Sequence, residues 1–295
     1  MEIQTHNIIP IVVPQKYYVD QYGLHNAYFE NNLSLFIHGN KVILLIRQIN
    51  YRKFKNQHYT LGSQHSISHY CMMVGNMDGD KFVNIVHYDI IYDWNNFTET
   101  DAQYKGMDDI RFINHKDLLV ICSDRNVNLK PCLFHATLES NVITLRERLQ
   151  PSVLEKNWMP YRYRDNYFVI YHVSPFTVKS IFNDDRRVIE LDDNVNKKLE
   201  GYHGSTNGIE FKGELLFLIH RYTCIYGISK IVHRWVMFDP IHDTVKVSEE
   251  FSFFNYSFLE FNCSIQYYNG LYYLSLAVNE DKIYVVVLTP DMITI

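Results

Sequence analysis

The sequence has little of what marks several common classes of protein. Its 295 residues include five cysteines (Cys71, Cys122, Cys132, Cys224 and Cys263), which are far apart and form no C-x-x-C pair. A disulfide framework or a structural zinc site is therefore not expected, and reduced thiols in the cytoplasm fit better. Lysine and arginine are scattered rather than gathered in a stripe, and the formal charge is −5. We therefore predict no nucleic-acid partner.

Long apolar runs and linkers are missing as well. The IIPIVVP segment at residues 8–14 is too short and too often interrupted by proline for a signal peptide or a membrane span. No stretch rich in proline, glycine or serine divides the chain, so we expect one domain over residues 1–295. Glycine-rich phosphate loops, H-E-x-x-H, G-x-S-x-G and dinucleotide-binding fingerprints are all absent.

Strand-forming residues are abundant, whereas helical periodicity is scarce. Aromatic residues make up 15% of the chain, mostly Tyr (23) and Phe (18). One pattern recurs, a short polar turn followed by apolar or aromatic residues, as in HGNKVILLIR (His38–Arg47) and RDNYFVIYH (Arg164–His172). Each such unit predicts a β-hairpin.

These hairpins alternate with a second, more polar kind, and together they predict repeated four-stranded sheets. The repeats lie near residues 33–91, 108–149, 158–191, 208–251 and 260–293. We therefore expect an all-β protein, a five-bladed β-propeller with an active-site pocket on its central axis. An irregular β-sandwich, or a pair of them, is the alternative on pattern alone.

The residues that lead into each inner hairpin are more polar than a purely structural strand requires. Examples are KGMDDIRF (Lys105–Phe112) and EKNWMPY (Glu155–Tyr161). Because the inner strands of a propeller line its axis, we expect these side chains to converge at one mouth. Cations there would hold phosphate oxygens, and carboxylates would bind hydroxyls or transfer protons, which suits a sugar that carries an anionic group. A structural pairing of Asp109 with Arg111 and a core position for Trp158 are the alternatives.

Several segments resemble five-bladed propeller enzymes that act on β-mannosides, namely β-mannoside phosphorylases, hydrolases and related β-1,2-mannosyltransferases. KGMDDIRF resembles their G-x-E-D-x-R strand. EKNWMPY is similar to an EKNW-x-P element, and IVHRWVMFD to a closing HR-x-x-x-x-D stretch. The resemblance extends in order over roughly residues 30–290, and EKNW and HRW-x-x-FD are its most specific parts.

The resemblance implies an inverting mechanism with one catalytic aspartate and no metal or other cofactor. In the phosphorylases that residue follows the strand after E-D-x-R, so Asp124 is the best match and Asp109 the second. Candidates for binding phosphate or a donor are Arg47, Arg111, Lys156, His220 and Arg221. Candidates for binding sugar are Asn50, Asn157, Trp158 and Asn207. The implied partners are an oligosaccharide or sugar acceptor and a nucleotide sugar or sugar phosphate.

The sequence also departs from the family pattern. Asp108 replaces the usual Glu, Ile110 replaces the usual Pro, and the hairpin between Asp109 and Asp124 is shorter. A glycosyltransferase or glycoside phosphorylase is the leading hypothesis. A glycoside hydrolase is the second; it needs two carboxyl groups roughly 6.5–9.5 Å apart, for example Asp124 with Glu155 or Asp109. A non-catalytic propeller that binds a glycan or a protein is the third.

Overall fold

The computed structural model describes residues 5–19, 23–54, 57–149, 156–183, 185–225, 228–254, 257 and 259–295. Most of these residues lie in strands and the turns between them. They contain one α-helix, α1 (Asp193–Leu199), and one 3-10 turn, η1 (Pro290–Met292). Within these ranges no helix is long and apolar enough to cross a membrane. All five cysteines are described and none is in a disulfide; the cytoplasmic location stays a prediction.

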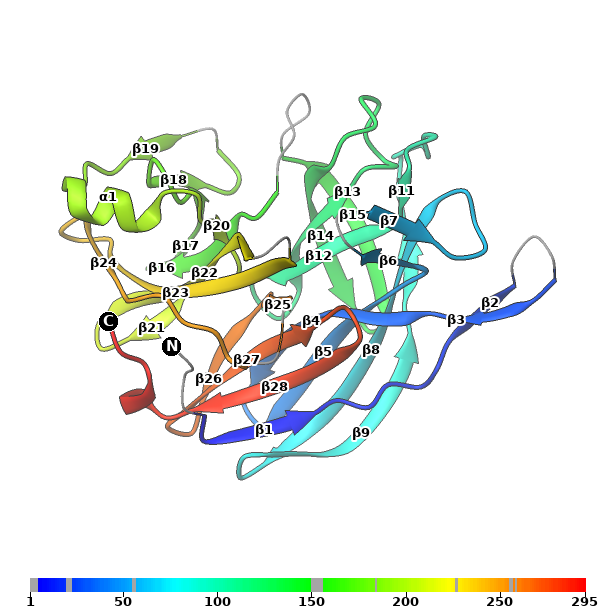
Figure 1. The fold of residues 1–295 in the computed structure, drawn as a ribbon, viewed down its shortest axis with the longest axis horizontal. Coiled ribbons are helices and arrows are strands. Elements are labelled where there is room, and N and C mark those ends of the chain that lie inside the picture. Colours follow the sequence, from blue (N-terminus) through cyan, green and yellow to red (C-terminus); the bar gives the residue numbers. More distant parts are fainter. Residues whose placement is uncertain are drawn as a thin grey trace.

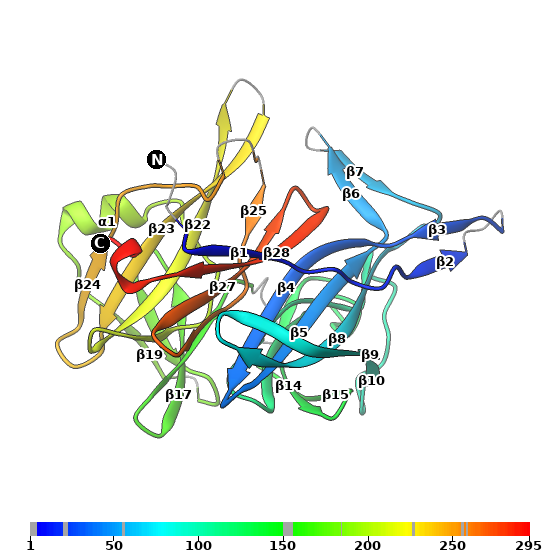
Figure 2. The same cartoon turned by 90° about the horizontal axis from the view of Figure 1, so that it is seen from below.

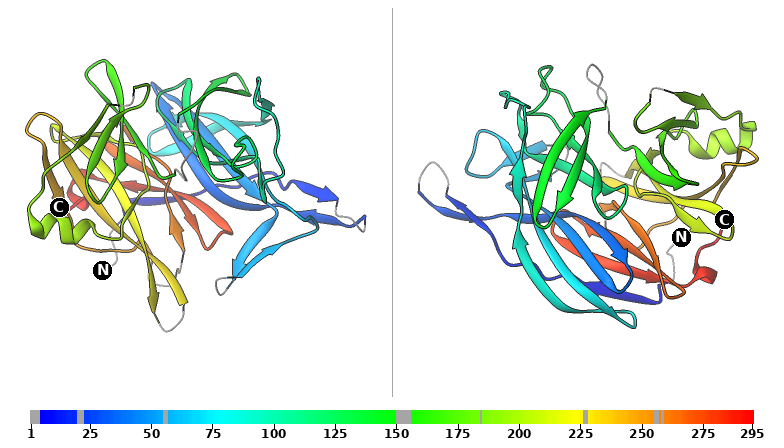
Figure 3. Two further views of the ribbon diagram at one scale, coloured as in Figure 1. Left: turned by 90° about the horizontal axis from the view of Figure 1, so that it is seen from above. Right: turned by 180° about the vertical axis from the view of Figure 1, so that it is seen from behind.

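Most of the strands form five sheets that follow one another round a ring in chain order (Figures 1 and 3). The first comprises β4 (Phe29–His38), β5 (Lys41–Ile49), β8 (Ser66–Asp78) and β9 (Lys81–Asp89). The second comprises β12 (Met107–Phe112), β13 (Asp117–Cys122), β14 (Cys132–Glu139) and β15 (Val142–Arg148). The third comprises β16 (Met159–Tyr163), β17 (Asn166–His172), β18 (Thr177–Ser180) and β19 (Arg186–Val188). The predicted all-β, five-bladed propeller is confirmed.

The last two blades have interrupted inner strands. In the fourth, β20 (His203–Gly204) and β21 (Ile209–Phe211) both pair with β22 (Glu214–Ile225), which β23 (Ile228–Asp239) and β24 (Thr244–Val247) follow. In the fifth, β25 (Glu260–Phe261) and β26 (Ile265–Tyr268) both pair with β27 (Leu271–Val278), which β28 (Lys282–Leu288) follows. Two short strands extend these sheets: β10 (Ile91–Asp93) pairs with β15, and β11 (Tyr104–Lys105) pairs with β8. Two separate hairpins consist of β2 (Tyr17–Val19) with β3 (His25–Ala27), and of β6 (Tyr51–Phe54) with β7 (Gln57–Thr60).

The N-terminal segment supplies the outer strand of the last blade. β1 (Asn7–Pro10) runs antiparallel to β28, with Asn7 opposite Val287 and Pro10 opposite Tyr284 (Figure 2). The sequence pattern placed the last blade within 260–293 alone and left β1 unassigned, because the partner of β1 lies at the other end of the chain. This pairing joins residues near the two ends of the described chain; a single domain stays a prediction.

A second difference concerns the loop before the fourth blade. The charged residues of 183–201 predict a solvated outer strand and loop; the structure has the exposed outer strand β19, but α1 follows it in place of a loop. The Asp192 carboxylate accepts hydrogen bonds from the amides of Asn194 and Val195 at 2.9 and 3.0 Å, which caps the helix. Leu199 is completely buried and anchors the helix to the core.

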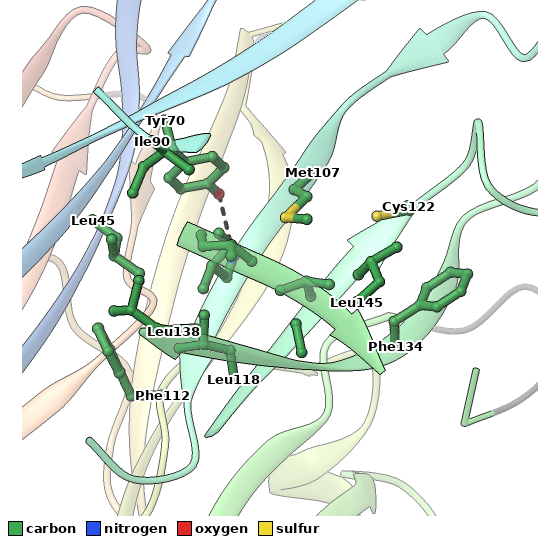
Figure 4. Close-up of a cluster of buried hydrophobic side chains, with 14 of the residues drawn as sticks. Leu45, Tyr70, Ile90, Met107, Phe112, Leu118, Cys122, Phe134, Leu138 and Leu145 are labelled. Carbon is green, nitrogen blue, oxygen red and sulfur yellow. Dashed lines mark hydrogen bonds between the residues drawn. The ribbon is translucent and has the colours of Figure 1, made fainter. Parts of the chain in front are cut away.

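Apolar clusters between neighbouring blades hold the inner strands in place. The cluster between the first two blades includes Leu45, Tyr70, Met107, Phe112 and Phe134 (Figure 4). Complete burial of a side chain such as Phe134 contributes about 1.5–3 kcal/mol. Tyr70 also has a polar role, because its hydroxyl accepts a hydrogen bond from the amide of Ile110 at 3.2 Å (Figure 4). This contact fixes β12 where it reaches the axis.

The contribution of ring closure can be measured with one charged substitution in β1. Ile8 packs against the apolar cluster that contains Leu274 and Val286. We expect Ile8→Asp to lower the free energy of unfolding by about 1–3 kcal/mol, because it brings a carboxylate against that cluster. The control is Val12→Asp, at a side chain that is 80% exposed, for which a change within about 0.5 kcal/mol is expected. If urea unfolding gives the same loss of unfolding free energy for Ile8→Asp and Val12→Asp, β1 does not stabilise the ring.

Candidate active site

The inner strand of the second blade carries an irregularity at the axis. Asp108 pairs with Ile121 and Arg111 with Leu119, so β12 contains one extra residue between these two positions. Asp109 has a φ of 41°, in the left-handed region that residues other than glycine rarely adopt. In a regular strand, neighbouring side chains point to opposite faces. The bulge instead allows both carboxylates, of Asp108 and Asp109, to approach the same guanidinium.

That guanidinium belongs to Arg47, at the end of the second strand of the first blade. Its Nη2 contacts the Asp108 carboxylate, and its Nη1 lies 3.5 Å from Oδ1 of Asp109. The remaining contacts of Arg47 are with Ser68 Oγ through Nε at 2.9 Å, with the Tyr51 hydroxyl at 2.6 Å and with Asn31 Oδ1 at 3.3 Å. All three nitrogens of the Arg47 guanidinium thus have partners within the protein, and its role in binding phosphate stays a prediction.

The two carboxylates differ in their surroundings. Asp108 also accepts a hydrogen bond from Ser68 Oγ at 2.9 Å. Burial raises the pKa of Asp108, the charge of Arg47 offsets this only in part, and the charge of Asp109 adds to the rise. Asp109 accepts a hydrogen bond from the Asn32 amide, and the side chains of Asp108 and Asp109 keep 23% and 18% of their surface exposed. Asp109 is thus a carboxylate held in place by neighbours on one side and accessible on the other.

A second arginine lies beside this pair but is only partly bonded. Arg111 is 1% exposed, and its Nε donates to the carbonyl of Ser205 in the fourth blade at 2.7 Å. Its Nη1 donates to the backbone carbonyl of Asp109 at 3.3 Å. Its Nη2 is buried and has no hydrogen-bond partner among the residues that the structure describes. A buried guanidinium nitrogen without a partner is costly, which makes it a candidate ligand for an anion.

Three further basic side chains surround Arg111, and we call the four together the cationic cluster: Arg111, Lys156, His203 and His220. His220 Nδ1 lies 2.7 Å from Ser205 Oγ, and the rings of His203 and His220 are 5.9 Å apart. Burial lowers the pKa of His220 well below its ordinary value, and the charges of Arg111 and Lys156 contribute. Burial also lowers the pKa of His203, again with a contribution from Lys156. The two imidazoles therefore lie close to the permanent charges of Arg111 and Lys156.

The buried Glu260 contacts His233, the strand neighbour of His220. His233, on β23, is directly opposite His220 on β22. Its Nε2 lies 3.3 Å from Oε2 of Glu260, and both side chains are completely buried. The Glu260 carboxylate also accepts hydrogen bonds from the amides of Phe253 and Phe254, each at 2.7 Å. These contacts fix the segment that connects the fourth and fifth blades at the axis.

The structure separates the two aspartates that the sequence proposes for catalysis. Asp124 is 2% exposed, and its Oδ2 accepts a hydrogen bond from the amide of Gly106 at 3.0 Å. Burial raises its pKa. Gly106 has a φ of 86°, so Asp124 secures the turn from which β12 starts. Asp109, with 18% of its side chain exposed, is thus more accessible than Asp124. Which of the two acts in catalysis stays a prediction. Glu155, the other acid considered, lies outside the described residues.

Among the predicted phosphate ligands, Arg111, Lys156 and His220 come together, and Arg221 does not. Neighbouring residues of a strand point to opposite faces, so Arg221 lies on the other side of β22 from His220. Its Nη2 donates to Glu250 at 2.7 Å, and the Tyr202 hydroxyl donates to the same carboxylate at 2.6 Å. Arg221 therefore fastens the segment around Tyr202 and is not part of the cationic cluster.

Three of the four predicted sugar contacts are buried and have partners within the protein. Asn50 is completely buried, accepts from the amide of Ile67 at 2.6 Å and donates to the carbonyl of His65. Asn207 exchanges two hydrogen bonds of 3.0 Å with the backbone of Ile265, which joins the fourth blade to the fifth. Trp158 is completely buried, with the Lys179 ammonium 4.8 Å from its ring centroid, so no sugar can stack on it.

The fourth predicted sugar contact, Asn157, keeps an accessible position. It is half-buried and has a φ of 65°, next to Lys156 of the cationic cluster. A Cβ atom on Gly204 would lie 2.2 Å from the carbonyl oxygen of Asn157, so the two segments can approach only because Gly204 has no side chain. That Asn157 binds sugar stays a prediction.

Sequence reasoning missed several residues at this site, among them Asn32, Ser68, His203 and Ser205. Asn32 and Ser205 lie in polar segments that lead into inner hairpins, so their position was a usable signal. Ser68 lies within a predicted apolar strand, and its role depends on the bulge in β12. No group of three His, Cys, Asp or Glu side chains suited to a metal ion occurs within the parts of the chain described.

The dependence of the carboxylate pair on Arg47 predicts a pH-dependent loss of stability. Arg47→Gln leaves Asp108 and Asp109 without their counter-charge, so we expect the free energy of unfolding to fall by about 3–5 kcal/mol at neutral pH. Without Arg47 the pKa of Asp108, already raised by burial, rises further above its unfolded value. The penalty is then greatest above the folded pKa and shrinks as the pH falls through it.

Urea unfolding between about pH 8 and about pH 5 measures this dependence. The matched control is Arg162→Gln, because Arg162 pairs with Asp165 at 3.0 Å on the surface, where the side chains are 62% and 95% exposed. That control is expected to change stability by about 0–1 kcal/mol. A penalty for Arg47→Gln that stays constant over this range would contradict the electrostatic role of Arg47.

No protein-family model and no curated protein sequence matches this chain. Solved structures do match it. One is a β-1,2-mannobiose phosphorylase from Listeria innocua in complex with β-1,2-mannobiose, with a TM-score of 0.60 at 12% identity, over 97% of this chain and 98% of that one. Another is a glycosyl hydrolase from Bacteroides ovatus, with a TM-score of 0.63 at 13% identity, over 98% of this chain and 93% of that one.

A mannose phosphorylase from Leishmania mexicana, in complex with phosphate, matches with a TM-score of 0.52 at 12% identity, over 98% of this chain and 90% of that one. At these identities the likeness concerns the fold. The coverage is nearly complete in both directions, so it extends round all five blades. This chain has the five-bladed propeller fold of the β-mannoside phosphorylases and glycosidases.

Proposed function

We propose that this protein is a carbohydrate-active enzyme that makes or breaks β-mannosidic linkages, with phosphate or a phosphorylated sugar as its second substrate. One observation carries the proposal. The buried Arg111 has an unpartnered Nη2 within the cationic cluster and is hydrogen bonded to the backbone of the accessible acid, Asp109. An anion site and a proton-transfer group thus share the axis of a fold found in mannoside phosphorylases and glycosidases.

The cationic cluster suits a phosphate group. A guanidinium donates in a fixed plane that matches phosphate oxygens, and Lys156 adds a mobile positive charge. His203 and His220 can donate hydrogen bonds to an anion, and bound phosphate would favour their protonated forms. The same groups would hold the phosphates of a sugar 1-phosphate or of a nucleotide sugar, so a transferase is compatible with this site.

Asp109 is the proposed acid and base. In phosphorolysis its protonated carboxyl would give its proton to the oxygen of the glycosidic bond as that bond breaks. A phosphate oxygen would form the new bond to the anomeric carbon from the opposite face, which inverts its configuration. In the synthetic direction the Asp109 carboxylate would take the proton from the acceptor hydroxyl as phosphate leaves. Arg47 and Asn32 hold the carboxylate in position for either direction.

A hydrolase on the same scaffold is the second candidate. It would need a second carboxylate to activate water, at roughly 6.5–9.5 Å from the acid in an inverting enzyme. The neighbouring Asp108 is held by Arg47 and Ser68, and Arg111 lies beside the backbone of Asp109. That distribution of charge favours attack by phosphate over attack by water, and the accessible Asp109 argues for catalysis over simple binding.

The proposal predicts phosphate-dependent cleavage of β-1,2-mannobiose, measured as release of mannose 1-phosphate. Asp109→Asn is expected to lower kcat by on the order of 10²–10⁴, because it removes the transferable proton while keeping the shape of the side chain. Asp124→Asn should retain most of the activity and mainly lower thermal stability, since Asp124 secures the Gly106 turn. Loss of activity in Asp124→Asn with activity kept in Asp109→Asn would reverse this assignment. Cleavage that does not depend on phosphate would favour the hydrolase.

The cationic cluster predicts that anions bind more tightly at lower pH. Burial holds the pKa values of His203 and His220 below the ordinary value, so both are neutral at neutral pH. Sulfate remains a dianion throughout, so a change in its affinity reports on the protein. Affinity should increase as the pH falls through these pKa values, because the protonated imidazoles attract the anion.

Titration calorimetry with sulfate at several pH values tests this expectation. Lys156→Ala should weaken sulfate binding by about tenfold, equivalent to about 1.4 kcal/mol. Lys212→Ala is the control, because Lys212 is also an exposed lysine but lies in the turn between β21 and β22, at the far end of its blade. Equal sulfate affinity in the two variants would contradict an anion site at the cationic cluster.

A further inference from the structure

A cleft of about 480 Å³ opens between the third and fourth blades, away from the candidate site. Its lining comes from the strands β16 to β19 and from Pro240 in the turn between β23 and β24. Asn157, next to the cationic cluster, precedes β16, whereas Tyr163 ends it, so roughly 20 Å of extended chain separates the two. The volume lies within the range of about 300–1,000 Å³ that is typical of small-molecule sites.

The register of the third blade places aromatic and polar side chains together on the face that lines the cleft. Residues directly opposite each other in antiparallel strands share a face of the sheet. Tyr161 is opposite Phe168, which is opposite Ser180, and Tyr163 is opposite Asn166. Tyr161 belongs to the buried cluster between the third and fourth blades, whereas Tyr163 and Phe168 are only partly buried at its edge. The apolar core between these blades therefore ends here, and the rest of the face is open.

Packing from both blades fixes the aromatic wall of the cleft. The rings of Tyr161 and Phe168 are stacked, with their centroids 5.6 Å apart and their planes at 23°. Tyr161 in turn packs edge-on against Phe217 and Phe238 of the fourth blade, at centroid distances of 5.6 and 6.3 Å. A ligand would therefore meet aromatic surface that is already ordered, which reduces the loss of side-chain entropy on binding.

The polar groups of the cleft are mostly uncharged. The side chains of Asn166, Ser180 and Asn183 line it and make no hydrogen bond with any other residue that the structure describes. Amides and hydroxyls can each donate and accept hydrogen bonds. Asp185 adds a carboxylate, which accepts strong hydrogen bonds from hydroxyl groups. Aromatic surface beside such groups suits a ligand that has both apolar faces and many hydroxyls.

Two arginines border the cleft, but their guanidinium groups have other partners. Arg187 forms an ion pair with Asp243 of the fourth blade. The Arg186 guanidinium lies 4.3 Å from the ring centroid of Tyr171, which belongs to the apolar cluster on the other face of the third blade. A phosphate would have to compete with Asp243 for Arg187 and would meet the negative charge of Asp185. The cleft therefore favours a neutral ligand.

We propose that the cleft between the third and fourth blades is a second carbohydrate-binding site, which takes a short neutral glycan. Phe168 and Tyr163 would contact the apolar face of a sugar ring, since aromatic rings supply a large, rigid contact surface. Asn166, Ser180 and Asp185 would bond its hydroxyls. The cleft holds no group for proton transfer in the reaction at the axis. Its occupation does not depend on whether the axis is catalytic, so this inference goes beyond the proposed function.

Hydrogen-exchange mass spectrometry locates a bound glycan without relying on activity. The probes are β-1,2-mannotetraose, cellotetraose and maltotetraose, each added to the full-length Asp109→Asn variant, in which the proposed cleavage is suppressed. We expect at least one of them to slow exchange in residues 162–168 and 179–183, which border the cleft. Protection confined to the axis, for example to residues 107–112, would overturn the inference but leave the proposed function intact. Absence of protection at the cleft with all three glycans would also overturn it.

Substitutions identify the side chains that bind, because the glycan concentration at half-maximal protection of these segments gives the Kd of the cleft alone. Tyr163→Ala should raise that Kd by about twofold to tenfold, as expected for loss of one aromatic contact. Asn166→Ala should raise it as well, and its side chain is exposed, so the fold should be retained. Neither change should alter phosphate-dependent cleavage of β-1,2-mannobiose when Asp109 is restored.

Tyr167→Ala is the matched control. Tyr167 is half-buried like Tyr163 and lies in the same hairpin, but it is on the other face of the blade, where its hydroxyl accepts a hydrogen bond from Asn114 at 3.1 Å. It should leave the Kd of the cleft unchanged. An equal rise for Tyr163→Ala and Tyr167→Ala would contradict a site in the cleft. Protection of the cleft that is lost in Tyr163→Ala alone would support it even if no cleavage of mannobiose were found.

Discussion

The contact of Arg47 with two adjacent carboxylates is the interaction on which the rest of the site depends. Asp108 and Asp109 are neighbours in sequence, and holding both partly buried would be unfavourable without a positive charge between them. Arg47 reaches both only because the bulge in β12 and the left-handed backbone of Asp109 turn the two side chains the same way. The Tyr70 hydroxyl, bonded to the amide of Ile110, and the surrounding apolar cluster support that irregular backbone.

This arrangement separates charge across the axis. The carboxylates lie against the first blade through Arg47, whereas Arg111 of the same strand is bonded to Ser205 of the fourth blade. Lys156 adds a second positive charge on that side, the imidazoles of His203 and His220 lie beside it, and the buried Glu260 contacts His233. A sugar phosphate has the matching asymmetry, with hydroxyls to face the acids and an anionic group to face the cations. The charge distribution is therefore a stronger argument for phosphate chemistry than any single residue.

The ring itself makes such a site possible, because no single blade contains it. The first two blades supply Arg47 and Asp109, the segment before the third supplies Lys156, and the fourth and fifth supply His220 and Glu260. Each sheet packs mainly against its neighbours through separate apolar clusters. The positions of these site residues relative to one another therefore depend on closure of the ring. The pairing of β1 with β28 contributes to that closure.

The repeat could be predicted from local pattern. Polar turns and apolar runs indicated five blades, the polar segments before the inner hairpins led to Asp109, Arg111 and Lys156, and the residues after them led to His220. Which of these side chains lie together depends on contacts between blades. Strand alternation sends Arg221 away from His220, the bulge makes Asp109 accessible while Asp124 is buried, and Asn50, Asn207 and Trp158 find partners in the protein itself. The reason is physical: a local pattern shows which residues share a face or an end of a strand, whereas the partner of a side chain comes from a blade distant in sequence. The pairing of β1 with β28, between opposite ends of the chain, is the clearest case.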